Sequence, residues 1–140
     1  MAVQMNIVYE GQLECSVQHG PSKATVKTQA PVDNGGKGES FSPTDLMASA
    51  LGACMLTIMG LTANKLSLNL TGTSVTVIKE MVAEPLRRIG TLKVSIRVVS
   101  RSELSDAQKE TLTQAALTCP VAQSINPAIK MPTDIQWTLA

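Results

Sequence analysis

The feature that most constrains this 140-residue chain is a run of nineteen residues, 46–64, without a charged side chain. A strong helix start precedes the run, because Ser42 is a favoured N-cap residue and Pro43 suits the first helical position. Asp45, three residues after the cap, completes a capping pattern. A long uncharged helix either crosses a membrane or lies buried in a fold or a dimer. Ser, Thr and Gly residues dilute its hydrophobicity, so we expect burial and no membrane span.

Apolar periodicity divides the rest of the chain into strands and helices. Alternation typical of strands occurs three times before the long helix and three times after it. Ser105 and Gln108 form a second capping box, which predicts another helix. The expected strands are residues 5–9, 13–18, 24–29, 70–81, 88–100 and 135–139, and a short helix is expected at 121–125. The order β-β-β-α-β-β-α-α-β predicts an α+β fold, and the length fits one domain over residues 1–140.

Composition and charge argue against nucleic acid as a partner. Twelve Lys and Arg residues oppose eleven Asp and Glu residues, so the net charge is only +1 and no basic stripe is present. Tyr9, Phe41 and Trp137 are the only side chains that could stack on bases, and they are far apart in the sequence. The first residues lack the pattern of a signal peptide, so we expect a cytoplasmic protein.

The residues with chemical potential are three cysteines, which we expect to be free thiols in the cytoplasm. Together with His19 they show no metal-ligand spacing, and we expect neither a metal nor a bound cofactor. His19 is interpreted as a turn residue beside glycine and proline, with a role as a base left open. Cys119 precedes a proline that suits a helix start, so it is a plausible N-cap where a thiolate is stabilised. Cys54 lies in the uncharged helix and Cys15 in a strand, where either could simply pack.

Two motifs together resemble a known family. The segment SPTDL at residues 42–46 leads through small residues to Cys54, and a CPV segment at residues 119–121 lies far downstream. This pattern resembles the OsmC/Ohr family, that is, osmotically induced protein C and the organic hydroperoxide resistance proteins. The loop sequence DNGGKGESFSPTDL is similar to a less characterised branch of it. The resemblance implies an OsmC-like fold, with antiparallel sheets packed around long central helices in an intertwined homodimer.

The resemblance also implies a mechanism. Cys54 would be the peroxidatic thiolate that attacks a small organic hydroperoxide, releases the alcohol and becomes a sulfenic acid. Cys119 would be the resolving thiol that condenses with it to a disulfide. A dithiol or a lipoylated protein would then reduce that disulfide by exchange. An apolar pocket would favour organic hydroperoxides, because each buried methylene contributes about 0.8 kcal/mol.

The sequence departs from the family pattern beside the helix start. The family has a Glu after the helix-start proline and an Arg in its N-terminal strands, whereas this chain has Thr44 and no Arg before Arg87. Glu39, in the glycine-rich loop 30–41, and Arg88 are the candidates to supply the missing carboxylate and cation. Two alternatives therefore stay open. The protein could be an OsmC-like redox or apolar-ligand-binding protein with little turnover, or its cysteines could only pack.

Overall fold

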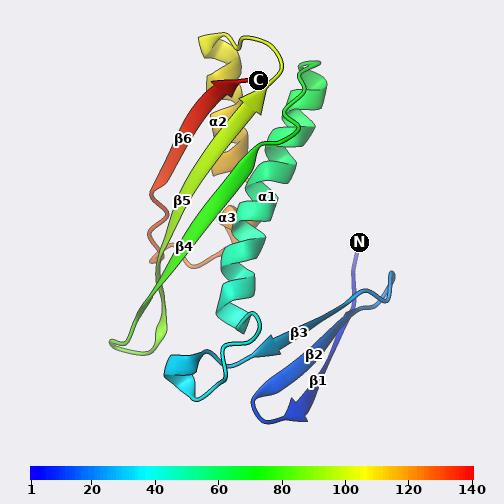
Figure 1. Cartoon of the computed structure of the whole chain (residues 1–140), viewed down its shortest axis with the longest axis vertical. Coiled ribbons are helices and arrows are strands. Elements are labelled where there is room, and N and C mark those ends of the chain that lie inside the picture. Colours follow the sequence, from blue (N-terminus) through cyan, green and yellow to red (C-terminus); the bar gives the residue numbers. More distant parts are fainter. The chain divides into compact units, whose positions relative to one another are not determined.

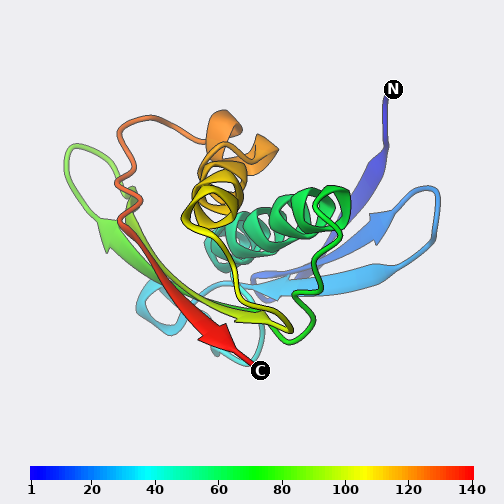
Figure 2. The same cartoon turned by 90° about the horizontal axis from the view of Figure 1, so that it is seen from above.

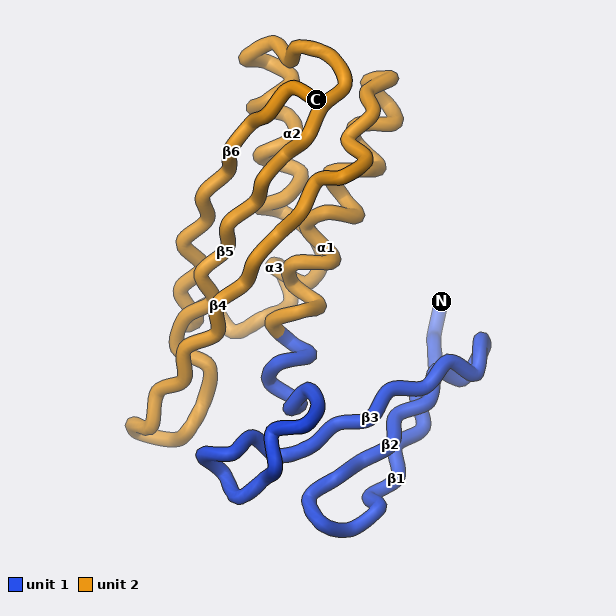
Figure 3. Tube along the Cα trace, viewed as in Figure 1, with its two compact units in different colours: residues 1–47 blue, residues 48–140 orange.

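The computed structural model describes all 140 residues, which form two compact units, Met1–Met47 and Ala48–Ala140. The boundary lies inside the long helix α1 (Pro43–Lys65), as Figures 1 and 3 show. The mixture of helices and strands confirms the predicted α+β fold. The single domain expected over residues 1–140 stays a prediction.

The first unit contains a three-stranded antiparallel sheet in the order β1-β2-β3, which confirms the three strands predicted before the long helix. Its strands are β1 (Met5–Gly11), β2 (Glu14–His19) and β3 (Thr25–Gln29). The loop that follows β3 contains one turn of 3-10 helix at Val32–Asn34, where the sequence predicted only loop. Large apolar side chains of β1 are exposed, among them Ile7 and Tyr9.

The second unit contains a separate sheet in the order β4-β5-β6. Its strands are β4 (Ser74–Val82), β5 (Arg88–Ser100) and β6 (Thr133–Leu139). The first pair is antiparallel as expected, but β6 is parallel to β5, which corrects the expectation of purely antiparallel sheets. The reason is the connection: the chain crosses back through α2 (Asp106–Leu117) and α3 (Pro120–Ser124) before β6 begins.

Local hydrogen bonds explain where the predicted boundaries hold and where they fail. The capping box before α2 is confirmed, since the Gln108 N–H donates to Ser105 Oγ at 3.1 Å and the Ser105 N–H donates to Gln108 Oε1 at 2.9 Å. The strand predicted to begin at residue 70 begins at Ser74 instead. A turn precedes it, because the Asn69 side chain accepts the N–H of Thr71 and Gly72 adopts a positive φ of 98°.

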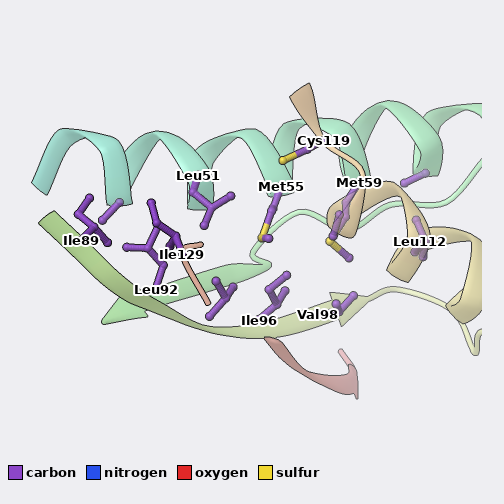
Figure 4. Close-up of a cluster of buried hydrophobic side chains, with 14 residues drawn as sticks. Leu51, Met55, Met59, Ile89, Leu92, Ile96, Val98, Leu112, Cys119 and Ile129 are labelled. Atoms are coloured by element: carbon purple, nitrogen blue, oxygen red, sulfur yellow. The ribbon is translucent and has the colours of Figure 1, made fainter. Parts of the chain in front are cut away.

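The hydrophobic core of the second unit lies between its sheet and the helices. In Figure 2, α1 and α2 lie on the same face of the β4-β5-β6 sheet. Alternate residues of β5 point to that face and are buried, as are Leu51, Met55 and Met59 of α1. Figure 4 shows this cluster, whose labelled members also include Ile89, Leu92, Ile96, Val98, Leu112, Cys119 and Ile129. By length and composition alone α1 could cross a membrane, as many core helices of soluble proteins could.

Candidate thiol site

Two cysteines that are far apart in the sequence meet in the second unit. Cys54 lies in the middle of α1 and is partly buried, whereas Cys119 lies just before α3 and is completely buried. Cys54 contributes to the raised pKa of Cys119, so the two side chains are neighbours, and both are free thiols. The structure therefore brings together the two residues to which the family resemblance assigned redox chemistry.

The backbone around Cys119 follows from its neighbours. Helix α2 ends at Leu117, and Cys119 is extended, with φ −62° and ψ 153°, before Pro120 opens α3. Proline suits this first helical position because its missing N–H needs no partner there. The predicted N-cap position is thus confirmed. The N–H groups of Val121 and Ala122 lower the pKa of Cys119, although the Cys119 side chain forms no capping hydrogen bond with α3.

The surroundings of Cys119 favour its neutral thiol, which corrects the expectation that this N-cap position stabilises a thiolate. Burial raises the pKa of Cys119 above its ordinary value of 9.0, and the hydrogen bond and charge of Cys54 raise it further. The N–H groups of Ala122 and Val121 act in the opposite direction, but the raised pKa shows that burial and Cys54 dominate. Cys119 is therefore protonated at neutral pH, and its S–H can donate to the Cys54 sulfur.

The pair lies in apolar surroundings. Cys119 belongs to the buried core cluster and Cys54 packs against that cluster. Figure 4 shows the Cys119 side chain against α1, near the part of the helix that carries Met55. Two hollows of about 570 and 350 Å³ lie elsewhere in this unit, and neither is lined by a cysteine. Their linings instead include Met59 and Gly60 in the larger hollow and Trp137 in the smaller one.

The start of α1 is held by the predicted capping pattern. The Ser42 N–H donates to Asp45 Oδ2 at 2.8 Å, and the Asp45 N–H donates to Ser42 Oγ at 3.0 Å. Ser42 is buried, and its hydroxyl also lies 3.1 Å from the hydroxyl of Thr44. Asp45 therefore caps the start of α1, as the sequence predicted. The sequence analysis gave this carboxylate no role in the thiol chemistry.

The two proposed supporting residues lie in different parts of the chain. Glu39 belongs to the first unit, where its side chain is exposed and its N–H donates to Gln29 Oε1 at 3.0 Å. Arg88 begins β5 in the second unit and is exposed, and its Nη1 donates to the carbonyl of Ile89 at 3.1 Å. The supporting roles of Glu39 and Arg88 beside the thiols stay predictions.

The remaining candidates take structural positions. His19 Nδ1 lies 2.6 Å from Ser22 Oγ in the connection after β2, which agrees with its interpretation as a turn residue. Cys15 lies in β2, paired with Tyr9 on one side and Thr28 on the other. No group of three or more His, Cys, Asp and Glu side chains is placed to hold a metal ion.

The family model described as OsmC-like protein matches residues 36–134, which include both cysteines. Among solved structures, the fold is similar to a candidate osmotic stress induced and detoxification response protein from Psychrobacter arcticus 273-4. The two are 42% identical, with 97% of each chain covered and a TM-score of 0.86. A search of curated protein sequences found no significant match.

Two more distant structures share the fold. The organic hydroperoxide resistance protein OsmC of Legionella pneumophila is 18% identical over 97% of each chain, with a TM-score of 0.74. The organic hydroperoxide resistance protein of Elizabethkingia anophelis is 14% identical and has the same TM-score, covering 99% of this chain and 97% of that one.

Proposed function

This chain belongs to the family of OsmC-like proteins, and from that premise we propose that it reduces small organic hydroperoxides to alcohols through Cys54 and Cys119. The observation that carries the proposal is the proximity of the two thiols, which come from α1 and the start of α3 and pack in the same core cluster. The names of the Legionella and Elizabethkingia proteins support the choice of substrate.

In the proposed first step, the Cys54 thiolate attacks the distal oxygen of the hydroperoxide and the O–O bond breaks. The alkoxide takes up a proton and leaves as the alcohol, and Cys54 becomes a sulfenic acid. In the second step the Cys119 sulfur attacks the Cys54 sulfur. A disulfide forms, and the sulfenic hydroxyl leaves as water with the Cys119 proton. The contact between the thiols supports this step, because little movement separates them.

We propose that an external dithiol, either a small molecule or a lipoyl group carried by a protein, returns the disulfide to two thiols by exchange. The protein would act in the cytoplasm as a homodimer. The dimer is supported by the apolar side chains that the first unit exposes, among them Ile7 and Tyr9.

A second candidate function is a redox or apolar-ligand-binding protein with little turnover. It is favoured by Thr44, which stands where the resembling proteins have a Glu, and by the lack of any Arg before Arg87 in the sequence. A thiol without a cationic neighbour reacts slowly, since the thiolate is the nucleophile. The two candidates therefore differ in the rate at which Cys54 is oxidised.

The test treats reduced protein with one equivalent of cumene hydroperoxide, stops the reaction with an alkylating agent and maps disulfides by mass spectrometry. We expect a rapid Cys54–Cys119 disulfide, and a trapped sulfenic acid on Cys54 in the Cys119→Ser variant. Cys15→Ser is the matched control and should behave as the wild type. Thiols that react no faster than free cysteine would favour the binding protein instead.

A further inference from the structure

The thiol pair has a geometry that suits chelation. Cys54 and Cys119 are neighbours in the fold, because both pack in the same core cluster and Cys54 acts on the Cys119 thiol. Little conformational entropy is therefore lost when one atom bonds both sulfurs, and pre-organisation of this kind favours binding. Thiolate sulfur is a soft ligand, so the pair selects soft, thiophilic atoms.

The surroundings restrict which thiophilic atom fits. Cys119 is fully buried in an apolar cluster, and no third His, Cys, Asp or Glu joins the two sulfurs. Zinc in proteins almost always requires four ligands, which this site does not offer. A complex with a net charge would be costly in an apolar environment. The fitting ligand is one that two sulfurs satisfy and that leaves the site neutral.

We propose that the Cys54–Cys119 pair is a binding site for trivalent organoarsenic compounds. Arsenic(III) that carries one organic group forms two further bonds, so the two sulfurs complete its valence. With phenylarsine oxide, two As–S bonds form and the As=O bond breaks. The oxygen leaves as one water molecule with the two thiol protons. Arsenic stays in its trivalent state, no other reactant is needed, and the product is neutral.

The partial burial of Cys54 and the complete burial of Cys119 suggest an order for this reaction. Cys54, the less buried of the two residues, bonds the arsenic first, and Cys119 closes the ring from the interior. Val121 and Ala122 follow Cys119 in α3 and pack against the core cluster, so the organic group meets apolar side chains there. Because apolar burial favours binding, a phenyl group should be bound at least about tenfold more tightly than a methyl group.

The test adds phenylarsine oxide to reduced full-length protein in the absence of peroxide and records the intact mass. We expect one phenylarsenic group per chain, with two thiol protons lost. The adduct should survive washing with a monothiol and be released by 2,3-dimercaptopropanol. In Cys54→Ser and Cys119→Ser we expect retention to be at least about tenfold weaker, because a single sulfur gives no chelate. Cys15→Ser is the matched control and should bind as the wild type.

A second measurement uses only the wild type and so does not depend on the folding of variants. Iodoacetamide is added after phenylarsine oxide, and the alkylated sites are mapped. Untreated protein is the reference, because Cys119 is buried and escapes alkylation with or without the arsenical. We expect phenylarsine oxide to protect Cys54 relative to that reference, while Cys15 is alkylated equally in both samples. Alkylation of Cys54 that phenylarsine oxide does not reduce, or an adduct that a monothiol removes, would overturn the inference.

This inference uses the same thiols as the proposed function but does not require peroxide turnover, so the two can fail separately. A peroxide-induced disulfide without retention of phenylarsine oxide would leave the proposed function standing and remove the arsenical site. Retention without oxidation by peroxide would do the reverse.

Discussion

Cys119 differs from an ordinary cysteine because it is completely buried beside another sulfur. Burial and the neighbouring Cys54 raise the pKa of Cys119, so the folded chain holds the Cys119 proton to higher pH than the unfolded chain does. This suits a resolving thiol in the proposed reaction. Cys119 stays neutral and inert until the sulfenic acid forms beside it.

The raised pKa of Cys119 predicts how stability depends on pH. Below the ordinary value of 9.0 the thiol is protonated in both states, and its full contribution is present. Above that value the unfolded state releases the proton first, so it binds fewer protons than the folded state and the free energy of unfolding falls as pH rises. We expect urea unfolding of reduced protein to show this fall as the pH rises through and beyond 9.0.

Cys119→Ser is the control for this prediction, since its hydroxyl does not titrate in that range. Lysine and tyrosine titrate in both proteins, so the difference between the two curves isolates the thiol. The wild type should lose stability more steeply with rising pH than the variant. Parallel curves would show that burial does not hold the Cys119 proton.

At the scale of elements, the packing of α1 on β4 depends on a glycine. A Cβ atom at Gly52 would lie 3.0 Å from Val77 Cγ2 and 3.1 Å from Val75 Cγ1, which is too close for a relaxed contact. Both valines are branched at Cβ and have little rotamer freedom. They also pack against the core cluster, so they cannot easily move aside. Gly52 therefore sets how closely the helix that carries Cys54 approaches the sheet.

We predict opposite effects for alanine at the two glycines of α1. Gly52→Ala should lower the free energy of unfolding by about 1 kcal/mol or more, because overpacking outweighs the better helix propensity of alanine. Gly60→Ala should raise it by about 0.5–1 kcal/mol, because nothing lies within 4 Å of the added Cβ. Urea unfolding at one fixed protein concentration measures both changes.

Val75→Ala provides the check on the proposed clash. It removes a methyl group that the Gly52→Ala side chain would meet, so the double variant should be more stable than the sum of the single effects predicts. If the effects of Gly52→Ala and Val75→Ala simply add, the added methyl group does not meet Val75, which would mean that α1 has moved away from β4. A stabilising Gly52→Ala would show that the valines adjust freely.

Most features that depend on residues close together in the sequence were predicted correctly, whereas features that depend on distant residues were not. The caps of α1 and α2 were predicted because Ser42 and Ser105 each bond to a residue only three positions away. The start of β4 was placed too early, since the apolar Leu70 was counted into the strand while the turn set by the Asn69 side chain was overlooked. The parallel pairing of β6 could not be predicted from periodicity, because alternation does not reveal the direction of a neighbour.

The thiol site shows the same limit. The motifs named Cys54 and Cys119 as a pair through a family resemblance, and no spacing rule connects residues so far apart. Their contact arises from the packing of α1 against the junction between α2 and α3, which is a tertiary property. The positions of Glu39 and Arg88 were chosen by charge type alone, so their distance from the thiols could not be predicted.

At the scale of the whole molecule, the first unit leaves apolar surface exposed on one face of its sheet. Met5, Ile7 and Tyr9 alternate along β1 and are 53%, 59% and 63% exposed. Ile7 pairs with Val17, which pairs with Val26, so a row of apolar side chains crosses all three strands. Three strands alone make a marginal sheet, and exposed apolar patches mark interaction surfaces. This surface supports the proposed homodimer.

The homodimer predicts a specific response to a charge at Ile7, the member of that row on the outer strand β1. Ile7→Asp removes an apolar side chain and adds a carboxylate to the surface that a second copy would cover. Loss of a buried isoleucine costs about 1.5–3 kcal/mol, which corresponds to a dissociation constant at least about tenfold higher. Light scattering on a sizing column should show two copies for the wild type and a shift toward single chains, upon dilution, for Ile7→Asp.

Asn6→Asp is the matched control, because it adds the same charge one residue earlier in β1, where the side chain points to the opposite face. Asn6 is exposed and its Oδ1 accepts a hydrogen bond from the Gln4 side chain at 2.7 Å, which a carboxylate can also accept. The control should therefore dimerise as the wild type. Equal weakening by both variants would indicate a general charge effect. A wild type that is a single chain at every concentration would remove the homodimer and leave the thiol chemistry to act within one chain.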